Sequence, residues 1–282
     1  MASISTYFQG KTAIVTGGSS GIGLAVARIL AENGCSVAIL ARRKEALESA
    51  RQEIISIARD GVRVLALSTD VSDQDSVNAA VDTAISEFKG IDLLVNSAGV
   101  TMPGEFEKLS TSVFRDMMEI DYFGTLYAIQ AVLPNMLKQG QGAIVNISSV
   151  VGYLNIYGYS AYGAAKYAIS GLSDAMRMEL KPKGIQVSLV FPPDTDTPQL
   201  AFEQPFKPEA TKVLASNGGE EKPEKVAKEI LAGVAAGKYI INPGFSNKLI
   251  YFAVRLLGRG LVYSLMDRMI RPVLKRNSPA NP

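Results

Sequence analysis

The chain of 282 residues contains no histidine, and this absence removes several common kinds of active site. Without an imidazole there is no Ser-His or Cys-His nucleophile pair, no histidine ligand for a metal and no histidine general base. Any proton transfer must therefore use another titratable side chain, and the sequence predicts no metal site.

Cysteine is almost as scarce, since Cys35 is the only one. A single thiol cannot form an internal disulfide, and the apolar run NGCSVAIL favours a buried structural thiol over a nucleophile. A cysteine count this low fits a reducing compartment.

There is also no large excess of charge, because the formal net charge is +2. This value argues against nucleic acid as a partner, since nucleic-acid-binding domains carry a strongly basic surface. The N-terminal stretch MASISTYFQGK lacks the basic and apolar regions of a secretory signal, so we expect synthesis in the cytosol without export.

The chain does contain short apolar runs that alternate with segments of helical spacing. The runs are rich in β-branched residues, end at turn residues and read as strands buried on both faces. They are residues 12–17, 36–41, 63–70, 92–99, 143–149 and 186–192. This order predicts an α/β fold: a Rossmann-like, doubly wound parallel sheet with helices on both faces and ligands at the carboxyl ends of its strands.

The hydrophobic content of 47% is enough for one sizeable core, so we expect one domain over residues 1–246. A stretch rich in proline and charge, residues 204–225, predicts a substrate loop over about residues 199–225. Residues 247–282 form a separate, basic amphipathic C-terminal segment.

The first expected strand runs into TGGSSGIGLAVARIL, which places Gly17, Gly21 and Gly23 where strand turns into helix. Glycine there lets backbone N–H groups approach a pyrophosphate, and the positive end of the helix stabilises its charge. The alternative is an ordinary tight turn. The strand before and the helix after favour a dinucleotide site.

The second expected strand ends at AILARR, about twenty residues after the glycines, where an acidic residue holds the ribose of NAD. Ala41 occupies that place, so no carboxylate repels a 2′-phosphate, and Arg42 and Arg43 can bond it. The cofactor is therefore expected to be NADPH/NADP⁺, with Asp70 and Val71 flanking its adenine. The alternative is that both arginines are solvated at the start of a surface helix.

Tyr162 and Lys166 are four residues apart, so on a helix both side chains share one face. Ser149 ends an expected strand that opens at the same crevice. In a carbonyl reduction Tyr162 would protonate the developing alkoxide and Ser149 would hydrogen-bond the carbonyl oxygen. Lowering the pKa of a tyrosine from about 10 to about 7 requires roughly 4 kcal/mol, which we expect from Lys166, helped by the positive charge of the oxidised nicotinamide.

Three further tyrosines lie in the same stretch, and we expect each to pack or to line a substrate pocket. They are Tyr157, Tyr159 and Tyr167.

Taken together, TGGSSGIG, NSAG at 96–99, Ser149 and YGAAK at 162–166 resemble the short-chain dehydrogenase/reductase family over about residues 8–200. The resemblance implies that Ser149, Tyr162 and Lys166 are catalytic and that Lys166 and Tyr162 also contact the cofactor. It further assigns a set of cofactor-binding residues to the motifs and to the stretch after the last strand. These are Gly17, Ser19, Ser20, Gly21, Ile22, Gly23, Asn96, Ala98, Gly99, Pro192, Thr195 and Thr197.

Asp121, in MMEIDYFGT, stands where this family usually has an asparagine that helps to bind a water of the proton relay. A carboxylate can accept from such a water but cannot donate as an amide does, so we expect a modified relay with Asp121 as a catalytic residue.

The stretch FPPDTDTP, residues 191–198, has Pro193 where the family usually has glycine and is similar to the 3-ketodihydrosphingosine reductases. That similarity implies NADPH-dependent reduction of a long-chain keto-lipid that carries an amine next to its ketone. Asp194 or Asp196 would then pair with the ammonium, the alternative being that both carboxylates cap local turns.

The C-terminal segment carries seven basic residues against one acid over residues 247–276, and two amphipathic helices are expected there. Helical phasing groups Lys248, Arg255 and Arg259 on one face. Arg255 and Arg259 interrupt any apolar run of spanning length, so the sequence predicts peripheral membrane contact. The alternative is that the apolar stripes pack on the sheet or form a subunit interface.

We accordingly expect a homo-oligomeric, cytoplasmic enzyme held at a membrane, which in a eukaryote would be the cytosolic face of the endoplasmic reticulum. Two rival functions remain open. One is reduction of another lipid, steroid or secondary alcohol on the same fold, and the other is a catalytically silent NADP-binding regulatory protein, against which the intact Ser149, Tyr162 and Lys166 argue.

Overall fold

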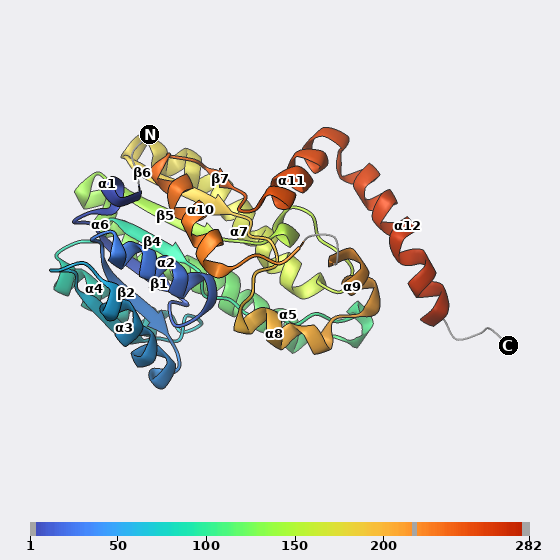
Figure 1. The fold of residues 1–282 in the computed structure, drawn as a ribbon, viewed down its shortest axis with the longest axis horizontal. Helices are drawn as coiled ribbons and strands as arrows, with labels where there is room; N and C mark the ends of the chain where they lie inside the picture. Colours follow the sequence, from blue (N-terminus) through green and yellow to red (C-terminus); the bar gives the residue numbers. More distant parts are fainter. Residues whose placement is uncertain (1–3, 216–218, 278–282) are drawn as a thin grey trace.

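The computed structural model describes residues 4–215 and 219–277 (Figure 1). A few residues of each expected part of the chain therefore lie outside the described ranges. These parts are the units 1–246 and 247–282 and the loop 199–225. Seven parallel strands form one sheet in the order β3-β2-β1-β4-β5-β6-β7. The strands are β1 (Thr12–Thr16), β2 (Ser36–Ala41), β3 (Val64–Ser68), β4 (Leu93–Asn96), β5 (Gly142–Ile147), β6 (Ile185–Val190) and β7 (Ile240–Ile241).

The six predicted strands are confirmed, each within a few residues of its expected bounds. Only β7 was not predicted, because two residues are too few to show an apolar period. It pairs with β6 through Leu189 and Val190 and completes the edge of the sheet.

Helices cover both faces of the sheet, as the alternating pattern predicts (Figure 1). Buried side chains of α1, α2, α3 and α10 pack on one face, and those of α4, α6 and α7 pack on the other. The helices are α1 (Ile4–Phe8), α2 (Gly21–Glu32), α3 (Lys44–Ile57), α4 (Gln74–Phe88), α5 (Thr111–Met117), α6 (Gly124–Gln139), α7 (Ser160–Leu180), α8 (Pro198–Glu203), α9 (Glu209–Ala215), α10 (Pro223–Ala235), α11 (Phe245–Leu257) and α12 (Arg259–Asn277). Cys35 is fully buried in the first of these layers, so the structural-thiol interpretation is confirmed.

The strand order reverses between β1 and β4, which are neighbours in the sheet although they are far apart in the chain. A doubly wound sheet binds its ligand at such a switch point, beyond the carboxyl ends of the strands. The fold therefore places the segments after β1, β4, β5 and β6 around one crevice.

The expected substrate loop is not a loop over most of its length. It contains α8 and α9, and an isolated parallel bridge joins Thr195 to Glu221 at its base. The prediction was wrong here because two of the prolines that suggested irregular chain begin helical turns instead: Pro205 in the 3-10 helix Gln204–Phe206 and Pro223 in α10.

The two C-terminal helices confirm the expected pair, and they meet at an angle of 118°. Gly258 makes the break, with a φ of 75° that favours glycine. Figure 1 shows α12 running past α9 and away from the sheet. The grouping of Arg259 with Lys248 and Arg255 was wrong, because the bend puts Arg259 on α12, where its guanidinium lies 5.2 Å from the ring centre of Tyr167.

Candidate active site

The turn from β1 into α2 forms one wall of a cavity of about 320 Å³. Ser20 precedes the first turn of α2, and its side chain makes no capping hydrogen bond. The first N–H groups of α2 are thus left to a ligand, and an anion is the ligand that the positive end of a helix favours. A β-carbon at Gly23 would lie 2.5 Å from the carbonyl oxygen of Gly17, so only glycine lets the turn close this tightly. These features fit the pyrophosphate of a dinucleotide.

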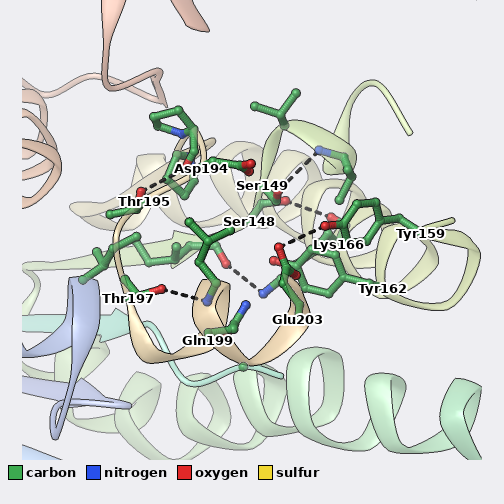
Figure 2. A pocket seen from close by; sticks show the side chains of 18 of the residues that line it. Ser148, Ser149, Tyr159, Tyr162, Lys166, Asp194, Thr195, Thr197, Gln199 and Glu203 are labelled. Carbon is green, nitrogen blue, oxygen red and sulfur yellow. Dashed lines mark hydrogen bonds between the residues drawn. The ribbon is translucent and has the colours of Figure 1, made fainter. Parts of the chain in front are cut away.

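The cavity brings together most of the residues that the sequence singles out, from four different strand ends (Figure 2). Those that line it are Gly17, Ser20, Gly21, Ile22, Ala98, Gly99, Ser149, Tyr162, Lys166, Pro192, Asp194, Thr195 and Thr197. Segments separated by more than a hundred residues therefore share one site.

A second group of the predicted residues does not line the cavity. It comprises Ser19, Gly23, Arg42, Arg43, Asp70, Val71, Asn96, Asp121 and Asp196. Asn96 is buried inside the sheet and donates to the side chain of Asn146, so it supports the strands below the cavity. Gly23 sits behind the turn that it allows to close.

Arg42 and Arg43 are exposed directly after β2, beside the end of β3. The carboxyl of Asp70 lies close enough to Arg42 for the two charges to interact. Burial acts to raise the pKa of Asp70, but hydrogen bonds from Ser72 and the charge of Arg42 outweigh it and hold the pKa below its ordinary value. Val71 packs against Gly124 and is 6% exposed, so it offers little surface to an adenine.

Ser149, Tyr162 and Lys166 meet above the end of β5 (Figure 2). Ser149 and Gln199 lie near the hydroxyl of Tyr162 and act to lower its pKa. The Nζ of Lys166 lies 5.4 Å from the ring centre of Tyr162 and donates to the carbonyl of Ile147 at 3.3 Å. The predicted convergence of these three side chains agrees with the geometry.

The pKa of Tyr162 moves in the direction opposite to the one expected. Burial raises it well above its ordinary value, with further increases from Asp121 and Glu203, while Ser149 and Gln199 act to lower it. Burial is the main reason, and the expected help of Lys166 is opposed by Asp121, whose Oδ2 lies 3.9 Å from the lysine Nζ, and by the negative charge of Glu203. These surroundings keep Tyr162 protonated, as a proton donor requires.

The loop after β6 contributes backbone and hydroxyl groups rather than carboxylates. Thr197 caps α8 by accepting from the N–H of Leu200 at 3.2 Å, and Thr195 donates to the carbonyl of Pro193 at 2.8 Å. Asp194 lines the cavity but its side chain is 45% exposed, whereas Asp196 is exposed and outside the cavity wall. Threonine, not aspartate, therefore makes the helix cap.

Sequence reasoning missed three residues at this wall. Gln199 and Glu203 come from α8 and line the cavity, and Lys207 follows α8 and pairs with Glu203. The spacing of four between Glu203 and Lys207 was the available signal. Tyr159, given as packing or pocket lining, does line the cavity.

The C-terminal helices also reach the cavity. Asn247, Ile250 and Met266 line it, and Asn247 donates to the carbonyls of Phe191 and Pro243. Val254 is buried against Tyr153 and Phe191. One face of this segment is thus packed on the core, which confirms the core-packing alternative for that face.

Comparison with known proteins is consistent with this geometry. The family model for short chain dehydrogenases matches residues 11–208. The chain is 37% identical to a 3-dehydrosphinganine reductase of Danio rerio, over 82% of this chain and 70% of that protein. It is 34% identical to a 3-ketodihydrosphingosine reductase of Dictyostelium discoideum, over 95% of this chain and 84% of that protein.

The chain belongs to the short-chain dehydrogenase family. A crystal structure of levodione reductase has the same fold, with a TM-score of 0.76 and 26% identity over 83% of this chain and 96% of that one. As a short-chain dehydrogenase the chain is an oxidoreductase that interconverts alcohol and carbonyl groups, and its cofactor is a nicotinamide nucleotide.

Asp121 is the residue at which this short-chain dehydrogenase departs from the family pattern. A π-helical turn, Met118–Phe123, follows α5 and carries Asp121 into the interior, where it is fully buried. Oδ1 accepts from the N–H of Val100 at 2.8 Å, while Oδ2 lies 3.9 Å from Nζ of Lys166 and has no hydrogen-bond partner among the described residues. Burial raises the pKa of Asp121 to about 6, although Lys166 and the Val100 bond act to lower it.

This raised pKa predicts a pH-dependent loss of stability that Asp121→Asn removes. The folded protein holds the Asp121 proton more tightly than the unfolded chain, so the free energy of unfolding falls as the pH rises from about 4 to about 6. The asparagine of the variant does not titrate, so the variant keeps its stability over this pH range. The free energy of unfolding of Asp121→Asn, compared with that of the wild type, should therefore be higher by a larger amount at about pH 7.5 than at about pH 4.5. Urea denaturation at both pH values measures it, and a difference that does not change with pH contradicts the prediction.

Proposed function

We propose that this enzyme reduces the ketone of 3-ketodihydrosphingosine to the alcohol of dihydrosphingosine with NADPH, a step of sphingolipid synthesis. The observation that carries the proposal is a cavity that joins the hydroxyl of Tyr162 to an apolar wall. The apolar side chains of that wall come from the stretch 150–156 and from α8, α9, α11 and α12. They are Val150, Val151, Leu154, Ile156, Leu200, Leu214, Ile250 and Met266.

The chemistry assigned to the chain is proton donation and orientation. Tyr162 gives its proton to the carbonyl oxygen as charge develops there, and Ser149 donates a second hydrogen bond to the same oxygen. Lys166 orients the nicotinamide ribose and restores the proton of Tyr162. The bound nicotinamide supplies the hydride.

NADPH is proposed over NADH because the end of β2 carries Ala41 followed by two exposed arginines. Arg42 and Arg43 face solvent beside Asp70. The last position of β2 is Ala41, so no carboxylate there repels a 2′-phosphate. The first turn of α2, with its uncapped N–H groups, provides for the pyrophosphate.

The substrate is tested by the rate of NADPH consumption with 3-ketosphinganine, a steroid ketone and a short secondary ketone. Preference for 3-ketosphinganine supports the proposal. If the enzyme prefers the steroid ketone or the short ketone, it reduces one of the rival substrates. If it binds NADPH but reduces none of the three, it is a catalytically silent regulatory protein.

We further propose that α11 and α12 hold the enzyme against a membrane on its cytosolic side. Their outward faces expose large apolar side chains: Phe245, Leu249, Phe252, Leu256, Leu257, Leu261, Leu265, Met269 and Leu274. Basic residues such as Arg255 and Arg268 lie among them, as in helices that lie on a bilayer. Within the described residues no single helix is long and apolar enough to span a bilayer, although the bent pair α11 and α12 passes the same test together.

Replacing the three most exposed apolar residues of α11 should release the enzyme from vesicles. Phe245, Phe252 and Leu256 are 73%, 64% and 70% exposed, so changing all three to serine leaves the packed face intact. Flotation with anionic phospholipid vesicles measures binding, and NADPH binding checks the fold. Undiminished flotation contradicts the membrane role. A change from oligomer to monomer in sedimentation, with no effect on flotation, would identify this face as the expected subunit interface.

A further inference from the structure

Three charged groups meet at one wall of the cavity, outside the reacting centre: Asp194 and Glu203 line the wall, and Lys207 lies behind them. Glu203 and Lys207 are 6% and 5% exposed, and the Nζ of Lys207 lies 2.8 Å from Oε1 of Glu203. The same Nζ lies 3.7 Å from Oδ2 of Asp194. The hydroxyl of Tyr159 donates to Oε1 of Glu203 at 3.0 Å.

This cluster is one positive charge short of balance. Two carboxylates face one ammonium, which leaves a net charge of −1 at a wall that is otherwise largely apolar. One ammonium is shared by a buried carboxylate and a half-exposed one, so the cluster favours a ligand that brings a second cation. Lys207 pairs most closely with Glu203, at 2.8 Å, and more distantly with Asp194, at 3.7 Å.

Glu203 is also close to the place where the carbonyl reacts. Tyr159, which bonds Glu203, has its ring centre 5.9 Å from that of the proton donor Tyr162. Figure 2 shows Glu203 beside Tyr159 and Tyr162 in the same wall, and its charge acts on the hydroxyl of Tyr162. A cation one carbon away from the reacting carbonyl would thus lie within reach of Glu203.

We propose that Glu203, oriented by Tyr159 and Lys207, binds the ammonium of a 2-amino ketone and makes the enzyme selective for amino ketones over plain ketones. The inference rests on the proposed keto-lipid reductase function and names the group that recognises its substrate. Glu203 suits this role better than Asp194, whose side chain is 45% exposed, and better than Asp196, which lies outside the cavity wall.

Glu203→Gln provides the test, because glutamine keeps the shape and an oxygen that accepts from Tyr159 and Lys207 but loses the charge. The kcat/KM for 3-ketosphinganine should fall at least about tenfold, mostly through KM, while that for a ketone of equal length without the amine should not fall. Asp196→Asn is the matched control, since it removes an exposed charge from the same loop, and it should leave the ratio between the two substrates unchanged. Equal losses on both substrates, or no loss on either, overturn the proposal.

A binding measurement separates this inference from the proposed function. Calorimetry with NADP⁺-loaded enzyme compares dodecylammonium with dodecanol, which differ in the cation but not in chain length. The wild type should prefer the amine, and Glu203→Gln should lose that preference. If the wild type binds dodecylammonium and dodecanol equally, Glu203 does not recognise the amine, even if the enzyme reduces ketones. This comparison needs only the wild type, so it tests the role of Glu203 even if the Glu203→Gln variant does not fold. An amine preference that Glu203→Gln abolishes, in an enzyme that reduces no keto-lipid, supports the cation site and contradicts the proposed substrate.

Discussion

Tyr162→Phe should lower kcat by roughly 10²- to 10⁴-fold while the affinity for NADPH stays close to that of the wild type. The substitution removes one hydroxyl and keeps the buried ring, so the packing of α7 against the cavity is retained. What is lost is the proton donor, together with its interactions with the neighbouring Ser149 and Gln199. Single-turnover reduction, followed by the loss of NADPH absorbance, measures the chemical step directly.

Tyr157→Phe is the matched control for this experiment. Its hydroxyl donates to Glu105 at 3.1 Å and the residue does not line the cavity, so the same loss of a tyrosine hydroxyl should leave kcat near the wild-type value. If Tyr162→Phe retains a large part of the activity, the proton comes from elsewhere and the catalytic assignment is wrong.

Arg42→Ala should weaken NADPH binding by roughly 10- to 100-fold and leave NADH binding almost unchanged. The lost contact is a charge-assisted hydrogen bond to the 2′-phosphate, a group that NADH does not have. Because Arg42 is exposed, its removal costs the fold little. Fluorescence titration with each cofactor gives the two dissociation constants.

Arg59→Ala controls for the loss of one positive charge. Arg59 is also exposed but follows α3 at the opposite end of the helix from Arg42, so neither cofactor should bind less tightly. Equal weakening of NADPH and NADH by Arg42→Ala would show that Arg42 does not read the phosphate.

The motif residues were predictable because each depends on its neighbours in the chain. Gly17 and Gly23 were predicted because the turn between strand and helix must be tight. The structure agrees, since a β-carbon at Gly23 would lie 2.5 Å from the carbonyl oxygen of Gly17. Tyr162 and Lys166 share a helix face because of their spacing of four. Six of the seven strands follow from buried apolar runs, which stay recognisable in any tertiary setting.

The charge environment was not predictable, because it depends on which segments meet. The direction of the Tyr162 pKa was missed because burial raises it most, and Asp121 and Glu203 then add to the increase from a π-helical turn and from α8. The same holds for the recognition of the substrate amine, which the sequence suggests for Asp194 or Asp196 and the geometry favours for Glu203.

The sequence by itself determined the parallel sheet, the strand-to-helix turn that fits a dinucleotide and the pair of C-terminal helices, because local periodicity and glycine placement encode all three. Only the tertiary structure decided which face of α11 packs on the core, and that Asn247 and Met266 complete the wall of the cavity. It alone also buried Glu203 and Lys207 as a pair beside Tyr159. The reason is that burial and charge pairing arise from contacts between segments far apart in the chain, and no local pattern records them.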